Sequence, residues 1–147
     1  MSKSLGNVVD PMDKLRVFGV DGFRYFLLKE GSIHSDCSYA DKRVVERINA
    51  DLANTLGNLL GRCTASSVNR LQELPPLSEA ALFEFITQDE RQVYNSLYDL
   101  PGYVDQHFQQ FHFSKALDVI MSQLHWANAF IQAHRPWVLS KEVATGI

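Results

Sequence analysis

The sequence predicts an all-α fold in which amphipathic helices form a bundle. Apolar residues recur at steps of three and four positions along the longer segments, which is the spacing of one helix face. No segment alternates apolar and polar residues over the length of a strand. With 46% hydrophobic and 21% charged residues, the 147-residue chain has the composition of a globular protein. Its length fits one domain, or one domain plus a fragment.

Two short helices are expected near the N-terminus. Asp10 and Pro11 are suited to a helix cap and first position, and Gly19 suits the exit. The second helix is expected to begin at an Asp21 cap and to run as far as Gly31. Its apolar face consists of Phe23, Phe26 and Leu27. The polar stretch that follows is typical of a connector.

The third and longest helix is expected from about Ala40 to Leu71. Its apolar stripe consists of Val45, Ile48, Leu52, Leu56, Leu59 and Cys63. Beside this stripe lies a row of small residues, Ala53, Gly57, Gly61 and Ala65. Two glycines inside a helix cost about 1 kcal/mol each relative to alanine. The row therefore predicts either a close crossing with another helix or a backbone that a ligand approaches.

Two further helical segments are expected after the adjacent prolines Pro75 and Pro76. The shorter one, residues 79–86, has Ser78 as its expected cap, and the longer one begins near Asp89. Pro101 lies inside the longer segment and is followed by a glycine. A kink or a break near Leu100 is expected, because proline cannot donate the helical hydrogen bond.

The last clear helix is expected to begin behind a Ser114 cap and to end near His134. Pro136 sets this end, because it lacks an amide hydrogen and disfavours helix in the residue before it. The aromatic corner at residues 111–113 is interpreted as core filling. Trp137 follows the proline directly. Its indole is either a stacking platform for an unpaired base or a plug for the end of the bundle.

Asn58 and Arg62 form a candidate binding pair. They are one helical turn apart, so both side chains leave the same face of the expected third helix. An amide and a guanidinium on one ridge are suited to the hydrogen-bonding edges of nucleic-acid bases. The alternative interpretation is an ordinary polar face in contact with solvent.

Composition narrows the class of partner. No apolar run approaches the ~18–20 residues of a membrane span. The net charge of −3 argues against a protein that coats nucleic acid without selectivity. We therefore expect neither a membrane nor DNA as a partner. The two cysteines, Cys37 and Cys63, are too few for a disulfide framework or a zinc site, and no metal ligands are expected in this segment.

The opening stretch Met1 to Asn7, MSKSLGN, carries the most informative motif. Lys3 lies between the hydroxyls of Ser2 and Ser4, and a lone ammonium among small donors suits a phosphate oxygen. The stretch resembles the Lys-Met-Ser-Lys-Ser signature of class I aminoacyl-tRNA synthetases. That pattern begins one lysine earlier, and no pair of histidines has the spacing of the companion His-x-Gly-His motif. The chain is therefore expected to be the C-terminal part of a larger enzyme, carrying half of an active site at most.

Two further segments narrow the resemblance. Asn49 to Arg62, NADLANTLGNLLGR, and Asn128 to Trp137, NAFIQAHRPW, are similar to the anticodon-binding bundle of the methionyl-tRNA synthetase family, in its mitochondrial type. The resemblance implies that residues 1–38 end the catalytic region and that residues 39–147 form an anticodon-binding bundle, incomplete at its C-terminus. Because the final helices of that bundle are missing, exposed apolar surface and self-association are expected.

The resemblance also implies roles for particular residues. Lys3 would be catalytic and would bind ATP together with Ser2 and Ser4. Contacts to the methionine anticodon would come from Asn58, Arg62 and Trp137. The parent enzyme would be a methionine–tRNA ligase that uses ATP with Mg²⁺, methionine and tRNA(Met), in the mitochondrial matrix or, alternatively, in the cytoplasm. The segment alone is expected to be inactive.

Two alternatives remain open at this point. The first is a stand-alone tRNA-binding module without catalysis, which the missing first lysine and the absent partner motif favour. The second is a class I synthetase for another amino acid, such as cysteine or leucine, whose signature loops are similar. The combination of Asn58, Arg62 and Trp137 argues against the second alternative.

Overall fold

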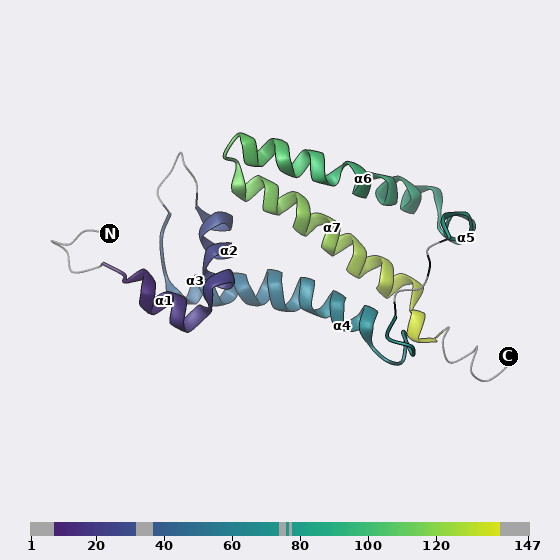
Figure 1. Cartoon of the computed structure of the whole chain (residues 1–147), viewed down its shortest axis with the longest axis horizontal. Coiled ribbons are helices and arrows are strands. Elements are labelled where there is room, and N and C mark those ends of the chain that lie inside the picture. Colours follow the sequence, from purple (N-terminus) through teal and green to yellow (C-terminus); the bar gives the residue numbers. More distant parts are fainter. Residues whose placement is uncertain (1–7, 32–36, 74–75, 77, 139–147) are drawn as a thin grey trace.

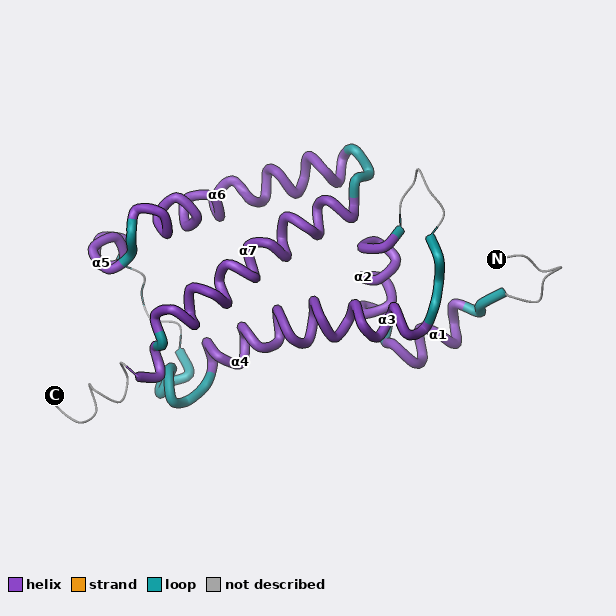
Figure 2. The backbone as a smooth tube through the Cα atoms, turned by 180° about the vertical axis from the view of Figure 1, so that it is seen from behind, coloured by secondary structure: helices purple, strands orange, loops and turns teal. Residues whose placement is uncertain are grey.

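The computed structural model describes residues 8–31, 37–73, 76 and 78–138. Within these residues the secondary structure is helical and includes no strand, which confirms the predicted all-α class (Figure 2). The elements in chain order are α1 (Pro11–Phe18), α2 (Val20–Glu30), α3 (Asp41–Arg47), the π-helix η2 (Ile48–Gly57), α4 (Asn58–Thr64), α5 (Glu79–Phe85), α6 (Gln88–Gln109) and α7 (Phe113–His134).

The longer helices run along the length of the molecule (Figure 1). The elements α3, η2 and α4 follow one another in a line, and together we call them the long helix (Asp41–Thr64) (Figure 1). Helix α7 runs in the same direction and contacts both η2 and α4, whereas α6 returns antiparallel to α7. The C-terminal ends of α4 and α7 therefore lie at the same end of the molecule.

The first two helices meet at a single glycine. The Asp10 carboxylate accepts a hydrogen bond from the Met12 amide at 2.8 Å, which confirms the predicted cap of α1. Gly19 ends α1 and precedes α2 with φ at 73°, a region that favours glycine. Because α2 begins at Val20, Asp21 lies in its first turn and the prediction of an Asp21 cap was wrong.

The long helix ends earlier than the sequence predicts. Its backbone stays helical through both junctions with η2, but α4 stops at Thr64, seven residues before the predicted end at Leu71. Thr64 is followed by a turn, in which the Gln72 side-chain amide donates to the Thr64 carbonyl at 2.8 Å. The end is therefore stabilised by a side-chain cap that the apolar periodicity could not indicate.

The buried face of the long helix lies beside the predicted apolar stripe. Val44, Asp51 and Thr55 are nearly inaccessible, whereas Val45 and Leu56, both in the predicted stripe, are 44% exposed. Two of the buried side chains are polar, and each has a hydrogen-bond partner: the Tyr25 hydroxyl donates to Asp51, and Thr55 donates to the Ala50 carbonyl. The predicted stripe was therefore partly wrong, because apolar spacing alone cannot show that polar residues with partners occupy the buried face.

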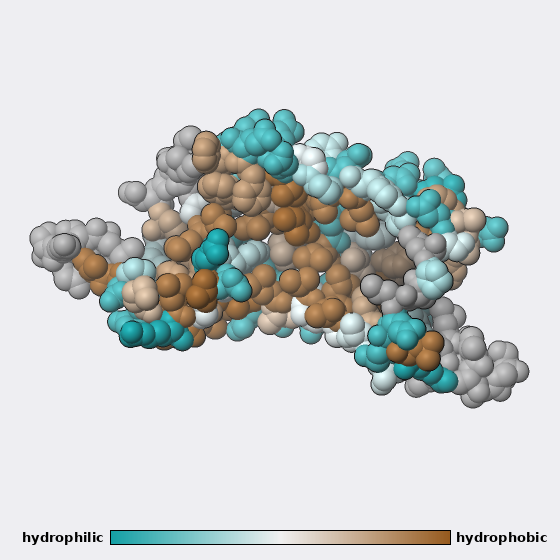
Figure 3. All heavy atoms as spheres, viewed as in Figure 1, coloured by the Kyte–Doolittle hydropathy of each residue, from teal (hydrophilic) through white to brown (hydrophobic). Residues whose placement is uncertain are grey.

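The best-buried core lies where α2 meets the long helix. Phe23, Phe26 and Val44 form this core, and Leu15, Phe18, Tyr39 and Ile48 pack around it. A β-carbon on Gly22 would lie 2.9 Å from the Ile48 Cδ1 atom, so glycine allows α2 and η2 to approach closely. In the space-filling view, apolar residues gather over the centre of the face of the molecule that Figure 1 shows (Figure 3).

The two helices α6 and α7 form an antiparallel pair. A capping box begins α6, since the Thr87 side chain and the Glu90 side chain each accept from the other's backbone amide. The helix then continues through Pro101, so of the predicted kink or break near Leu100 the break is absent. Pro101 is exposed, and water can bond the carbonyl that lacks a helical donor there.

The connection between α6 and α7 differs from expectation in two ways. Phe111 has a φ of 58° and is 63% exposed, so the aromatic corner is only partly core. Helix α7 begins at Phe113 and has no side-chain cap, which places Ser114 inside its first turn and overturns the prediction of a Ser114 cap. Its end at His134 is as predicted.

Candidate nucleic-acid interface

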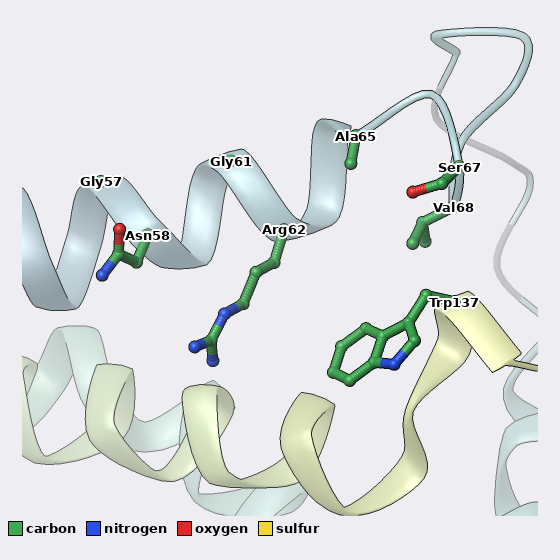
Figure 4. A pocket seen from close by; sticks show the side chains of 8 residues that line it. All are labelled: Gly57, Asn58, Gly61, Arg62, Ala65, Ser67, Val68 and Trp137. Carbon is green, nitrogen blue, oxygen red and sulfur yellow. The ribbon is translucent and has the colours of Figure 1, made fainter.

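A hollow of about 470 Å³ lies between the end of α4 and the end of α7. Its lining includes all three residues for which the sequence predicts contacts to an anticodon, namely Asn58, Arg62 and Trp137 (Figure 4). The remaining lining residues are Gly57, Gly61, Ala65, Ser67 and Val68. The structure thus brings together residues that are as much as 79 positions apart in the sequence, from Asn58 to Trp137.

Asn58 and Arg62 project from α4 on the side that faces α7 (Figure 4). Asn58 is exposed, and no hydrogen bond from a described residue reaches its side chain. Arg62 is half-buried, and its Nη1 donates to the Asn128 Oδ1 at 3.4 Å. Among the described residues, no carboxylate forms an ion pair with Arg62, which leaves most of its N–H donors available to a ligand.

The small residues of α4 form one wall of the hollow. A β-carbon on Gly61 would meet no described atom within 4 Å, so no helix crosses closely there and that alternative is wrong for this position. At Gly57 a β-carbon would lie 3.2 Å from the Leu52 carbonyl oxygen of its own π-helix. The row therefore leaves helical backbone accessible from the hollow, in keeping with the alternative of a ligand that approaches it.

Trp137 reaches the hollow because the chain turns sharply after α7. Arg135 adopts a left-handed conformation with φ at 44°, and residues 136–138 then form one short helical turn. The Val138 amide closes this turn by donating to the Arg135 carbonyl at 2.9 Å. The indole of Trp137 is half-buried and projects into the space beside Arg62 (Figure 4).

The end of α7 is attached to the start of α6 by His134. Its Nε2 lies 2.8 Å from the Glu90 Oε1, and its ring lies 4.3 Å from that of Phe130 and 4.8 Å from that of Phe85. The hydrogen bond from the Thr87 backbone amide lowers the pKa of Glu90 below its ordinary value, and the hydrogen bond with His134 lowers it further. These contacts fix the helix end from which Trp137 projects.

Asn128 is a residue of this site to which the sequence reasoning gave no role. It lies on α7, and its side chain contacts both Arg62 and the backbone of η2. The available signal was its position on the apolar face of α7, between Leu124 and Ile131. A polar side chain there requires a hydrogen-bond partner when it is buried.

Several predictions from the sequence concern residues or properties other than this hollow. Ser2, Lys3 and Ser4 fall outside the described residues. In the described ranges, no group of His, Cys, Asp and Glu side chains is arranged to hold a metal ion. Within the same ranges, no helix combines the length and the hydrophobicity that a membrane span requires.

The hollow offers one face for stacking, one guanidinium, one amide and an open stretch of helical backbone. None of its described lining residues is acidic. Such a set of groups can bind a planar, hydrogen-bonding ligand such as an unstacked base.

Comparison with known proteins identifies relatives of the whole chain. Residues 1–64 match the family described as tRNA synthetases class I (M). The mitochondrial methionine–tRNA ligase of Takifugu rubripes is 40% identical over 97% of this chain, and the human one is 41% identical over 97%. A bacterial methionine–tRNA ligase, from Fusobacterium nucleatum, is 38% identical over 98%.

Comparison with solved structures also identifies a methionyl-tRNA synthetase as similar. Methionyl-tRNA synthetase from Mycobacterium tuberculosis, solved in complex with methionyl-adenylate, superposes with a TM-score of 0.83 at 37% identity over 96% of this chain. The chain spans 27% of that structure and 22–26% of the three relatives above. The chain is therefore similar to methionyl-tRNA synthetases over nearly its whole length, and it spans about a quarter of the length of these relatives.

Proposed function

We propose that this chain is a segment of a methionine–tRNA ligase and that its hollow reads the anticodon of tRNA(Met). The observation that carries the proposal is the convergence of Asn58, Arg62 and Trp137 on one hollow, from two helices that are distant in sequence. The 37–41% identity to methionine–tRNA ligases and methionyl-tRNA synthetase over nearly the whole chain supports the choice of amino acid.

The physical basis is the open structure of an anticodon. Its bases are single-stranded, so their faces and edges are free to stack and to form hydrogen bonds. Trp137 would stack on one base, which is worth ~1–3 kcal/mol. Arg62 and Asn58 would bond base edges, and the accessible backbone at Gly61 would allow the ribose or a base to lie close to α4.

The test compares two reactions of the full-length enzyme. Replacing Arg62 or Trp137 by alanine should lower kcat/KM for charging tRNA(Met) by about 10- to 100-fold each, since each contact is worth ~1–3 kcal/mol. ATP–pyrophosphate exchange, which needs no tRNA, should keep its wild-type rate. Arg24→Ala, which removes the same charge from an exposed position on α2, is the matched control and should leave both reactions unchanged.

Unchanged charging in both variants would refute the role of the hollow. A parallel loss of charging and exchange would instead mean that the substitutions unfold the protein. Thermal unfolding of each variant separates these two outcomes.

The N-terminal residues would contribute to the activation of methionine by ATP. Attack of the methionine carboxylate on the α-phosphorus of ATP, as its Mg²⁺ complex, releases pyrophosphate, and Lys3 with Ser2 and Ser4 would bind the charge that develops on it. Lys3→Ala in the full-length enzyme should slow pyrophosphate exchange about 10²- to 10³-fold and leave tRNA affinity unchanged. A change in tRNA affinity alone would contradict this role.

We also propose a division of the chain into two regions, which the similarity to the same relatives supports. Residues 1–38 would close the catalytic region and residues 39–147 would belong to the anticodon-binding bundle, so the segment alone would bind tRNA without charging it. The similarity to mitochondrial ligases supports a location in the mitochondrial matrix. Imaging of the tagged full-length protein tests the location, and a cytoplasmic signal would contradict it.

A further inference from the structure

Asn128 connects α7 to the long helix through its side-chain amide. Its Nδ2 donates to the Thr55 carbonyl oxygen at 2.9 Å and to the Leu124 carbonyl oxygen at 3.0 Å. The first acceptor is on η2, and the second is one turn earlier on α7 itself. Both distances are ordinary for strong N–H···O bonds.

These two carbonyls determine how the amide is turned. A carbonyl oxygen accepts and cannot donate, so the NH₂ group of Asn128 must face Thr55 and Leu124. The Oδ1 atom is then fixed on the opposite side of the amide. Arg62 donates to this oxygen from Nη1 at 3.4 Å, which is a long hydrogen bond. The acceptor for Arg62 is therefore held in place by groups other than Arg62.

The same Thr55 carbonyl also contacts the second predicted binding residue. It accepts a hydrogen bond from the backbone amide of Asn58, at the junction of η2 and α4. Asn128 is thus linked to Arg62 directly and to Asn58 through one shared oxygen. The π-helix supports this arrangement, because the Thr55 hydroxyl bonds the Ala50 carbonyl at 2.8 Å, five residues back.

We propose that Asn128 is a positioning residue for the anticodon site: it holds the Arg62 guanidinium toward the hollow before nucleic acid binds. The inference rests on the proposed function of that hollow. An arginine side chain has many rotamers, and one that is already oriented loses less freedom when the ligand arrives. Asn128 itself does not line the hollow and would act through Arg62.

A double-mutant cycle in the full-length enzyme tests the proposal. Asn128→Ala should lower kcat/KM for charging tRNA(Met) about tenfold when Arg62 is present, and less than about twofold in the Arg62→Ala background. Pyrophosphate exchange should not change in any variant. The midpoint of thermal unfolding should fall by the same amount in both backgrounds, because the bridge between the helices is lost in both.

Ser122→Ala is the matched control. Its hydroxyl donates to the Val119 carbonyl of the same helix at 2.8 Å and has no other hydrogen bond among the described residues, so charging should stay at the wild-type level. Asn128→Asp is a second variant, which keeps an oxygen toward Arg62 but loses both donors. It should keep charging within about threefold of wild type at a temperature at which it is folded.

The outcomes separate the two proposals. An equal loss of charging on Asn128→Ala in both backgrounds, or an Asn128→Asp variant as defective as Arg62→Ala, would overturn the positioning role and leave only a structural bridge. If Arg62→Ala itself left charging unchanged, the proposed function would fail as well. A loss of charging on Asn128→Ala that depends on Arg62 supports both.

Discussion

The long helix divides at the junction of η2 and α4, and its two unequal halves, residues 41–57 and residues 58–64, use their polar side chains in different ways. In the first half, Asp51 and Thr55 are 7% and 6% exposed, and each has a hydrogen-bond partner within the protein. In the second half, Asn58 is exposed, Arg62 is half-buried, and both face the hollow (Figure 4). The first set forms hydrogen bonds within the fold, whereas the second set lines the hollow for which we propose a nucleic-acid ligand.

The electrostatics of the first half show the cost of burial and how it is offset. The Tyr25 hydroxyl donates to Asp51 at 2.7 Å, and Arg47 lies 3.6 Å from the same carboxylate while also donating to Glu30. Burial, and then the hydrogen bond to Asp51, raise the pKa of Tyr25 above its ordinary value. The phenol therefore stays protonated as a donor, and the buried carboxylate keeps its partners.

The largest predicted effect lies in this first half. Asp51→Ala leaves the Tyr25 hydroxyl without its acceptor at a partly buried site, so the free energy of unfolding should fall by about 2 kcal/mol. Tyr25→Phe removes the bond but leaves Arg47 beside the carboxylate, and should cost about 1 kcal/mol. Urea unfolding measures both. Arg62→Ala, the same kind of change in the second half, should have almost no effect, and a comparable loss there would contradict the comparison.

The two glycines of the small-residue row allow a matched pair of substitutions. Gly61→Ala should raise the free energy of unfolding by about 1 kcal/mol, because alanine favours the helix and the added carbon meets no described atom. At Gly57 the added carbon would press on the Leu52 carbonyl at 3.2 Å, so Gly57→Ala should gain less or lose stability. Thermal unfolding of the two variants side by side decides, and an equal gain would refute the difference.

The smallest effect concerns pH and the end of α7. The pKa of Glu90 is lowered in the folded protein, so its contribution to stability is complete above the unfolded value near 4.5 and is lost as the pH falls through the folded pKa. Glu90→Gln should therefore weaken the dependence of stability on pH below about 4.5. Unfolding curves at several pH values measure this slope, and an identical slope in both proteins would show that Glu90 does not contribute.

The sequence predicted most of the helices, and the shared face of Asn58 and Arg62, correctly. The Asp10 and Ser78 caps and the end of α7 before Pro136 follow from local chemistry, which acts within a few residues. Asn58 and Arg62 share a face because they are one turn apart in a single helix. That Trp137 lies beside them is a tertiary fact, and only the family resemblance indicated it.

The remaining differences arise where tertiary contacts override local pattern. The apolar stripe of the long helix was misplaced because the polar side chains of Asp51 and Thr55 are buried, each with a hydrogen-bond partner. The role of Asn128 depends on the carbonyl of Thr55, 73 residues earlier in the chain. No pattern in a single segment contains such a pair.

The most direct test of the central claim is the affinity of the full-length protein for an anticodon stem-loop. Wild type should bind the hairpin with the methionine anticodon more tightly than one with a changed anticodon, and the combined Arg62→Ala, Trp137→Ala variant should lose that preference while keeping its unfolding temperature. If the variant kept the preference, or if wild type had none, the second half of the long helix would have no role in reading an anticodon.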